Sequence, residues 1–210
     1  MHTLFCNTCD PSSCQCVQIS HHHQTNKQSL SVYELSSRGS FVKFLKKQSI
    51  SLTLSEYFDE VKAGETHNGV LCQNVEALTF DDQSFNICTS LEVFEHVEND
   101  LQGFKEIFRV LKNDGVFLFT VPIDMNNKTI ERTQLVDGKR VHILEPEYHS
   151  DNLRGSHKVF CYRNYGNDIV ERLKKAGFAH CEILEPSKSI LFGFARAVIV
   201  AGKTIKPKLN

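Results

Sequence analysis

Two histidines in polar loops are the side chains best suited to moving a proton near neutral pH. His96 directly follows Glu95, and His149 follows Tyr148 and stands two positions before Asp151. A neutral imidazole that is oriented by a carboxylate can act as a general base near pH 7. We therefore take His149 and His96 as candidate catalytic bases. Each also has a simpler interpretation, because His96 could only hold its loop to the next helix and His149 could be an exposed loop residue without a role.

A second group of reactive side chains lies near the N-terminus, where four cysteines precede three consecutive histidines at 21–23: Cys6, Cys9, Cys14 and Cys16. The Cys6-x-x-Cys9 spacing is that of half a zinc site, and thiolates favour tetrahedral zinc. The second pair, however, is close to the first and has a single residue between its members, unlike a zinc ribbon. We expect 1–29 to be a poorly ordered segment with free thiols and no metal, with zinc binding as the alternative.

The overall composition indicates an ordinary folded domain. The chain has 210 residues and a formal net charge of −1, which gives no reason to expect nucleic acid or an anionic membrane as partner. No run of about 18 apolar residues could span a bilayer, and the N-terminus lacks the pattern of a signal peptide. The cysteines are best interpreted as reduced thiols. We expect a cytoplasmic protein that acts on a small-molecule substrate, without a nucleic-acid or membrane partner.

The elements that must position these side chains follow the pattern of an α/β sheet. Residues 85–89 and 116–121 are apolar and β-rich, and the stretch 101–112 between them has apolar residues at helical spacing. Asn-Asp-Gly at 113–115 is expected to end this helix. A strand, a helix and a strand in this order are typical of a parallel sheet. Ligands bind beyond the carboxyl ends of such strands. The loop at 90–96 is therefore expected to face a site.

The remaining strands are expected at 30–35, 50–54, 69–73, 180–184 and 194–201, and the remaining helices at 41–47 and 165–176. The stretch 123–159 is polar and irregular, and an insertion of this length in a compact domain is usually functional or disordered. The chain thus divides into the segment 1–29, a domain at 30–203 that contains the insertion, and a tail at 204–210.

Three stretches resemble motifs of the class I S-adenosylmethionine-dependent methyltransferases. The sequence EALTFDDQSFN at 76–86 resembles the passage acid–x–Leu–Pro–Phe–x–Asp–x–Ser–Phe–Asp of that family. EVFEHV at 92–97 resembles its loop with a Glu-His pair, and EIFRVLKNDG at 106–115 resembles its helix end, E-I-x-R-V-L-K-P-G-G. The resemblance is best over 52–178. It implies a Rossmann-like three-layer sandwich with a mostly parallel seven-stranded sheet and an antiparallel last strand.

A narrower resemblance joins the chain to a small bacterial-type subgroup of these methyltransferases whose substrate is unsettled. It rests on SEYF at 55–58, YHSD at 148–151 and NYG at 164–166.

The family resemblance implies S-adenosyl-L-methionine as cofactor and assigns residues to it. Glu34 would end the first strand, and Ser36 and Gly39 would lie in the turn where the family has Gly-x-Gly-x-Gly. Glu56 follows Glu34 by 22 positions (56 − 34), where an acid can accept both ribose hydroxyls. Tyr57 comes next in the same site.

The other side of the cofactor site would be formed by residues after the third and fourth strands. Asn74 stands where the family has an Asp that accepts from the adenine amino group, and an amide oxygen can accept the same bond. Val75 would add an apolar contact to the ring. Ser90 and Leu91 would line the opposite side.

The turn at 36–40, SSRGS, is the main departure from the family pattern, because it keeps a single glycine. Side chains stand where the backbone would approach the cofactor, and fewer residues can adopt φ > 0. Either the turn has a different conformation, with serine hydroxyls and Arg38 near the cofactor carboxylate, or the affinity is weak.

Three functional hypotheses follow. The first is a methyltransferase that acts on a small-molecule or glycan-like acceptor, which the insertion at 123–159 would select. The second is a catalytically degenerate methyltransferase fold that serves as a binding or structural module. The third, a zinc-dependent interaction protein, rests on the N-terminal cysteines alone.

Overall fold

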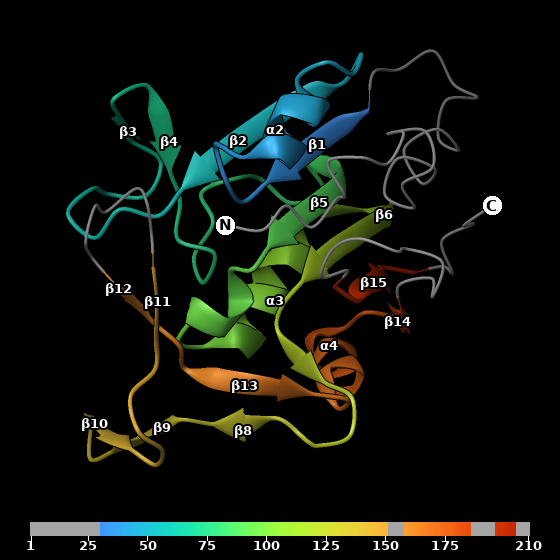
Figure 1. The fold of residues 1–210 in the computed structure, drawn as a ribbon. Coiled ribbons are helices and arrows are strands. Elements are labelled where there is room, and N and C mark those ends of the chain that lie inside the picture. The colour runs from blue at the N-terminus through green and yellow to red at the C-terminus, as the bar shows by residue number, and fades with distance from the viewer. Residues whose placement is uncertain (1–29, 151–157, 186–195, 205–210) are drawn as a thin grey trace.

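The structure is a computed structural model that describes residues 30–150, 158–185 and 196–204 (Figure 1). The segment 1–29 lies outside the described residues, so the expectations about its order and its zinc stay predictions. Asp151 and the first positions of the strand expected at 194–201 also lie outside them. In the described part of the chain, no helix is long and apolar enough to cross a membrane.

Eight strands form the central sheet in the order β14-β15-β6-β5-β1-β2-β4-β3. Their bounds are β1 (Ser31–Glu34), β2 (Ser51–Glu56), β3 (Thr66–His67), β4 (Val70–Cys72), β5 (Phe85–Leu91), β6 (Leu111–Thr120), β14 (His180–Leu184) and β15 (Val198–Gly202). The strands β4, β2, β1, β5 and β6 run parallel, whereas β15 runs antiparallel to both of its neighbours. The predicted mostly parallel α/β sheet with an antiparallel last strand is confirmed.

The sheet has one strand more than the seven that we expected, because β3 adds a short hairpin at the edge. Thr66 pairs with Leu71 in antiparallel register. The connecting residues Asn68 and Gly69 have φ values of 50° and 75°. Two successive residues with positive φ make the tight turn that suits the twist of a hairpin, and Asn-Gly is the preferred pair.

Helices cover both faces of the sheet, as expected for three layers (Figure 1). On one face, α3 (Asp100–Val110) and α4 (Ile169–Ala176) pack against Phe117 and Phe119. Side chains alternate along a strand, so Leu118 points to the opposite face. There it lines a pocket with Phe41, which belongs to the short helix α2 (Ser40–Leu45).

The boundary between α3 and β6 differs from our prediction. We expected residues 113–115, Asn-Asp-Gly, to end the helix, but α3 ends at Val110 and β6 begins at Leu111. Leu111 has extended backbone angles and pairs with Phe85 across an irregularity in the ladder. Pairing with β5 therefore overrides the local turn signal.

The insertion at 123–159 and the residues that follow it contain short strands, although the sequence of the insertion showed no periodicity. They are β7 (Ile123–Asp124), β8 (Ile130–Glu131), β9 (Thr133–Val136), β10 (Lys139–His142), β11 (Tyr148–Ser150), β12 (Lys158–Phe160) and β13 (Arg163–Gly166). β7, β13 and β8 form one small sheet, and β9–β10 and β11–β12 form separate pairs. Strands of two to four residues are too brief to give an alternating pattern that can be recognised.

The predicted helix at 165–176 begins four positions later than expected, at Ile169. Tyr165 and Gly166 belong to β13 and pair with β7. The buried face of α4 and its end were predicted correctly, since Leu173 is fully buried and Gly177 closes the helix with a φ of 115°.

We predict that Phe104→Leu will lower the free energy of unfolding by about 1–2 kcal/mol. The Phe104 ring is fully buried and stacks on Phe94, with ring centroids 4.4 Å apart. A leucine removes this stacking and leaves the space partly empty. Urea denaturation followed by circular dichroism measures the change, and Leu135→Ala is the control because Leu135 is exposed. A loss as small as that of the control would contradict the packing.

Candidate functional site

Five parallel strands end at one edge of the sheet, and the residues that the sequence singled out lie there. Glu34 is the last residue of β1, Glu56 the last of β2, and Leu91 the last of β5. The loop after β5 leads into a short 3-10 helix, η2 (Phe94–His96). The predicted site edge and the predicted site loop are therefore brought together.

Glu34 is fully buried at this edge. The Thr89 hydroxyl donates a hydrogen bond to Glu34 Oε2, whereas Oε1 has no hydrogen-bond partner among the described residues. Burial raises the pKa of Glu34 to about 8, against smaller opposing effects of Thr89 and Ser36. A buried carboxylate oxygen without a partner is costly unless a ligand or a proton satisfies it.

The turn at 36–40 has a defined conformation although it lacks two of the glycines of the family pattern. Gly39 has a φ of 101°, and it is the only residue of the turn with positive φ. A Cβ atom at Gly39 would meet no atom of the described chain within 4 Å. The turn thus adopts a conformation that requires one glycine, with open space in front of it.

Glu56 ties this turn to β2. Its Oε1 accepts hydrogen bonds from the backbone N–H and from the hydroxyl of Ser37, both at 2.8 Å. The Arg38 Nε lies 3.8 Å from the same oxygen. The expected acid at the end of the second strand is present, and one of its oxygens already holds the turn.

The residues predicted for the adenine side have structural contacts of their own. Asn74 Oδ1 accepts from the backbone N–H of Glu76 at 2.9 Å, as an Asx-turn does. Val75 packs against the core near Gly103 of α3. Tyr57 is exposed. Their cofactor contacts stay predictions.

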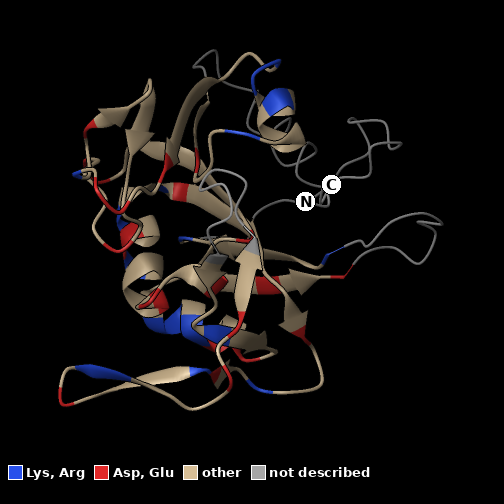
Figure 2. Ribbon diagram, turned by 60° about the vertical axis from the view of Figure 1, so that its left-hand side comes forward, with Lys and Arg blue, Asp and Glu red and all other residues tan. Residues whose placement is uncertain are grey.

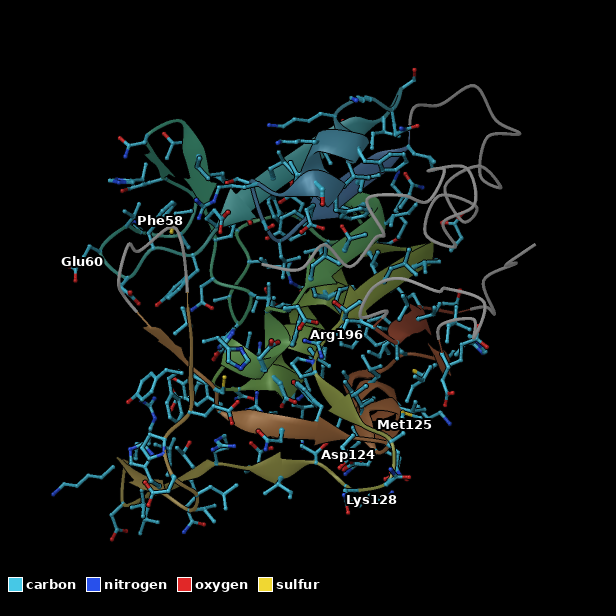
Figure 3. The ribbon with its side chains drawn as sticks, in the orientation of Figure 1. Phe58, Glu60, Asp124, Met125, Lys128 and Arg196 are labelled. Carbon is cyan, nitrogen blue, oxygen red and sulfur yellow. The ribbon has the colours of Figure 1, made fainter. Side chains whose placement is uncertain are left out.

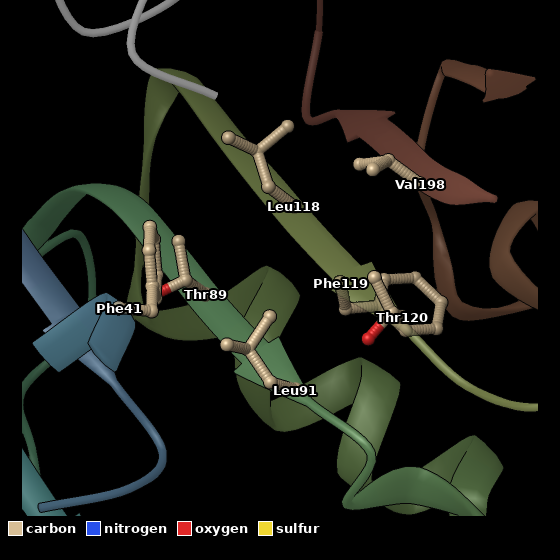
Figure 4. A pocket seen from close by; sticks show the side chains of 7 residues that line it. All are labelled: Phe41, Thr89, Leu91, Leu118, Phe119, Thr120 and Val198. Carbon is tan, nitrogen blue, oxygen red and sulfur yellow. The ribbon is translucent and has the colours of Figure 1, made fainter. Parts of the chain in front are cut away.

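A small apolar pocket opens beside the ends of β5 and β6 (Figure 4). Its lining consists of Phe41, Thr89, Leu91, Leu118, Phe119, Thr120 and Val198. Leu91 was predicted to line the site, and it does line this pocket. Ser90, which was predicted to line the same side of the site, is fully buried. The Ser90 hydroxyl has no hydrogen-bond partner among the described residues.

The two candidate bases, His96 and His149, lie side by side although 53 positions (149 − 96) separate them in the chain. Their ring centroids are 5.0 Å apart and the rings are nearly perpendicular. Both rings lie beside Glu95, whose Oε1 is 3.8 Å from His96 Nε2 and 3.9 Å from His149 Nδ1. The structure thus joins two residues that the sequence offered separately.

Glu95, which lies beside both histidines, is a residue to which the sequence analysis gave no role. Its side chain is 3% exposed, and neither oxygen has a hydrogen-bond partner among the described residues. Burial, and next the nearby Glu92, raise the pKa of Glu95 to about 8. Glu92 itself pairs with Arg196 at 3.3 Å, and Figure 3 labels this arginine near the carboxyl end of β5.

A carboxylate that the sequence analysis did not name lies beside His149. Asp151 lies outside the described residues, whereas Glu147 Oε1 lies 3.3 Å from His149 Nε2. Arg132 fixes Glu147 through an ion pair of 2.8 Å. Residues two apart in an extended chain lie on one face, and this spacing is the signal that could have identified Glu147.

A buried ionic network anchors the loop that carries these groups. Arg163 donates to the carbonyl oxygens of Val97 and Glu98 at 2.5 and 2.6 Å, and Arg172 pairs with Asp100 at 2.8 Å. Burial raises the pKa of Asp100, but Arg172 and Arg163 outweigh this effect and hold the pKa below its ordinary value. The loop and α3 are thereby joined to β13 and α4.

We predict that Asp100→Asn will lower stability by about 1–3 kcal/mol at pH 7 and will weaken its dependence on acid pH. The folded-state pKa of Asp100 lies below the unfolded one, so its stabilisation is present above the unfolded pKa. It is lost as the pH falls through the folded pKa. Urea denaturation of both proteins at several values between pH 3 and 7 tests this. Parallel losses at every pH would contradict it.

Comparison with known proteins agrees with the architecture. Residues 35–119 match the family model described as "Methyltransferase domain". This part of the chain is thus similar to a methyltransferase domain. Members of this family use S-adenosylmethionine as methyl donor, and the matched region starts directly after β1 and contains the turn, Glu56 and the loop of Glu95. Figure 2 shows acidic and basic residues interspersed over the described chain of this domain.

Individual relatives are distant. The chain is 28% identical over 138 residues to 24-methylenesterol C-methyltransferase 2 of Arabidopsis thaliana, and the match covers 61% of this chain and 34% of that protein. The chain thus spans about a third of the length of the curated relative it matches.

Solved structures share the fold at low identity. An S-adenosylmethionine-dependent methyltransferase from Mesorhizobium loti has a TM-score of 0.52 and 14% identity, over 91% of this chain and 99% of that one. A 1,6-didemethyltoxoflavin-N1-methyltransferase from Burkholderia thailandensis, with bound S-adenosylhomocysteine, has a TM-score of 0.50 and 16% identity. This match covers 91% of this chain and 76% of that one. The cyclase SpnF has a TM-score of 0.51 and 12% identity, over 91% and 82%.

Proposed function

We propose that the protein transfers a methyl group from S-adenosyl-L-methionine to a small-molecule or glycan-like acceptor. The observation that carries the proposal is the arrangement at the sheet edge, where Glu56 holds a turn that leaves open space at Gly39. This arrangement lies within the region that matches the methyltransferase family model.

The residues at this edge fit the cofactor. The open space at Gly39 lets the backbone approach a ligand closely, and Oε1 of the buried Glu34 lacks a hydrogen-bond partner among the described residues. Glu34, Ser36 and Gly39 would hold the methionine part, Glu56 and Tyr57 the ribose, and Asn74 the adenine, with Val75, Ser90 and Leu91 around them. When bound, the cofactor supplies an electrophilic methyl group, and the protein orients the acceptor toward it.

The acceptor side is proposed to lie at His96 and His149. An oxygen or nitrogen acceptor loses a proton on methylation, and a neutral imidazole can take it. The His149 side chain is 39% exposed and the His96 side chain 15%, so His149 is the more accessible of the two bases. The β11 strand that carries His149 belongs to the insertion, and we propose that the insertion selects the acceptor.

Calorimetric titration of the full chain with S-adenosylhomocysteine tests the proposal. We expect binding with one site per chain. Absence of binding at millimolar ligand would overturn the cofactor assignment and with it the proposed activity.

A second candidate function is a binding module that keeps the fold without catalysis. One observation favours it: Ser37 already occupies Oε1 of Glu56, which the ribose would need. The fold also occurs in proteins of other activity, as the cyclase SpnF shows. Binding of S-adenosylhomocysteine without methyl transfer to any acceptor in a broad panel would favour this candidate.

A further inference from the structure

Three side chains from separate segments converge at the mouth of the candidate site. His96 comes from η2, His149 from β11, and Cys161 from the residue after β12. One nitrogen of each imidazole and the thiol sulfur all lie within 4.8 Å of one another. The pairing of β11 with β12, which sets His149 opposite Val159, brings the cysteine to the histidines. Imidazole and thiolate are the ligand types that zinc prefers.

The hydrogen bonds of the two histidines involve one nitrogen of each ring and turn the other nitrogen toward a common point, Glu95 Oε1. His96 Nδ1 lies 3.8 Å from Cys161 Sγ and 2.9 Å from the Phe160 carbonyl oxygen, which only accepts, so Nδ1 carries the proton and Nε2 the lone pair. His149 Nε2 lies 3.3 Å from Glu147 Oε1, so Nδ1 carries the lone pair by the same reasoning. Metal-binding histidines are oriented in this way, with the other N–H donated to a carbonyl or a carboxylate.

The common point is marked by Glu95. Its Oε1 lies 3.8 Å from His96 Nε2 and 3.9 Å from His149 Nδ1, the two nitrogens that carry lone pairs. Ligand atoms around a tetrahedral zinc ion are roughly 3.3–3.8 Å apart, given bonds of about 2.0–2.3 Å. A proton between Glu95 Oε1 and one of the two nitrogens makes only that contact favourable, whereas a cation between the three atoms makes both contacts favourable. The buried Glu95 carboxylate, which lacks any hydrogen-bond partner among the described residues, is thus aimed into the cluster.

We propose that His96, His149 and Cys161 bind a zinc-type divalent cation, with the carboxylate of Glu95 facing the ion. The mixed nitrogen and sulfur ligands favour zinc over magnesium or calcium, which prefer oxygen. The half-exposed His149 leaves one side of the cluster accessible. This part of the inference rests on the proposed function: the ion would bind the acceptor through an oxygen, nitrogen or sulfur atom. It would thereby lower the pKa of the acceptor. His149 would then be a ligand, and the ion would replace it in activating the acceptor.

Cobalt titration of the full chain tests the site, because a cobalt–thiolate bond gives a charge-transfer absorption in the near ultraviolet. The protein is expressed without a histidine tag, treated with chelator, and carries serine in place of Cys6, Cys9, Cys14 and Cys16, so that only the remaining cysteines can produce the band. We expect one equivalent of cobalt to bind with this band and an equimolar addition of zinc to remove it. No band would overturn the proposal.

Variants assign the band to the cluster. Cys161→Ser is expected to abolish it and His149→Gln to weaken cobalt binding at least about 10-fold. Cys181→Ser is the matched control, because this half-buried cysteine lies in β14, and the band should remain. Circular dichroism establishes that each variant is folded. A band that survives Cys161→Ser in a folded protein would overturn the proposal.

The metal site and the proposed function can fail separately. S-adenosylhomocysteine is titrated calorimetrically into the same cobalt-loaded and metal-free samples. Cobalt binding without S-adenosylhomocysteine binding would support the metal site and contradict the proposed function. S-adenosylhomocysteine binding without a cobalt band would contradict the metal site and support the cofactor assignment of the proposed function.

Discussion

Replacing Glu56 with glutamine is expected to weaken binding of S-adenosylhomocysteine about 100-fold. The carboxylate accepts two hydrogen bonds from Ser37 at 2.8 Å and, in the proposed function, also faces the ribose. Hydrogen bonds to a charged group contribute about 1.5–3 kcal/mol each, and 1.4 kcal/mol corresponds to a factor of ten in affinity. Loss of the charge at a group with several donors therefore gives an effect of this size. Calorimetry at constant pH measures it.

Two further variants show whether Glu56 acts on the ligand or only on the turn. Ser37→Ala removes the hydroxyl that donates to Glu56 and keeps the carboxylate. If the carboxylate only fixed the turn, both variants would weaken binding to a similar extent. A role toward the ribose predicts a much larger loss for Glu56→Gln. Glu65→Gln, at an exposed position, is the control, and an affinity as high for Glu56→Gln as for this control would contradict the assignment.

The parallel sheet could be predicted because its strands are apolar runs separated by clear signals. β5, β6 and α3 are long enough to show their pattern, and their order alone indicates the architecture. The edge hairpin was missed although Asn68-Gly69 is a strong turn signal, because two-residue strands add almost no pattern. The limits of α3 and α4 were set by pairing of Leu111 and Tyr165 with neighbouring strands, which no local pattern contains.

The candidate site could be predicted only as separate residues. Glu34 and Glu56 are the last residues of their strands, and His96 lies in the loop after β5, so the sheet topology places all three. The contact of His149 with Glu95, and the approach of Cys161, depend on the pairing of β11 with β12. That pairing joins two strands of three residues each, and strands this short give no pattern that identifies a partner.

Arg163→Met is expected to lower the free energy of unfolding by about 3–5 kcal/mol, the largest effect on stability that we predict. The guanidinium is buried and donates to the carbonyl oxygens of Val97 and Glu98 and, at 3.0 Å, to the carboxylate of Glu131. Methionine fills similar space but donates no hydrogen bond. The substitution therefore leaves buried acceptors unsatisfied and Asp100 with one counter-charge fewer. Urea denaturation followed by circular dichroism measures the loss.

Arg140→Met is the matched control, because Arg140 also pairs with Glu98, at 2.8 Å, but both side chains are about 40% exposed. An exposed ion pair contributes about 0–1 kcal/mol. The difference between the two variants therefore measures how much the burial of the guanidinium, rather than its charge alone, contributes to stability. Arg163→Lys should lie between them, since an ammonium keeps the charge but cannot reach three acceptors as the planar guanidinium does. Val97 directly follows His96, so loss of this anchor should also loosen the loop of Glu95. Equal losses for the Arg163→Met and Arg140→Met proteins would mean that the loop is held by its apolar packing instead.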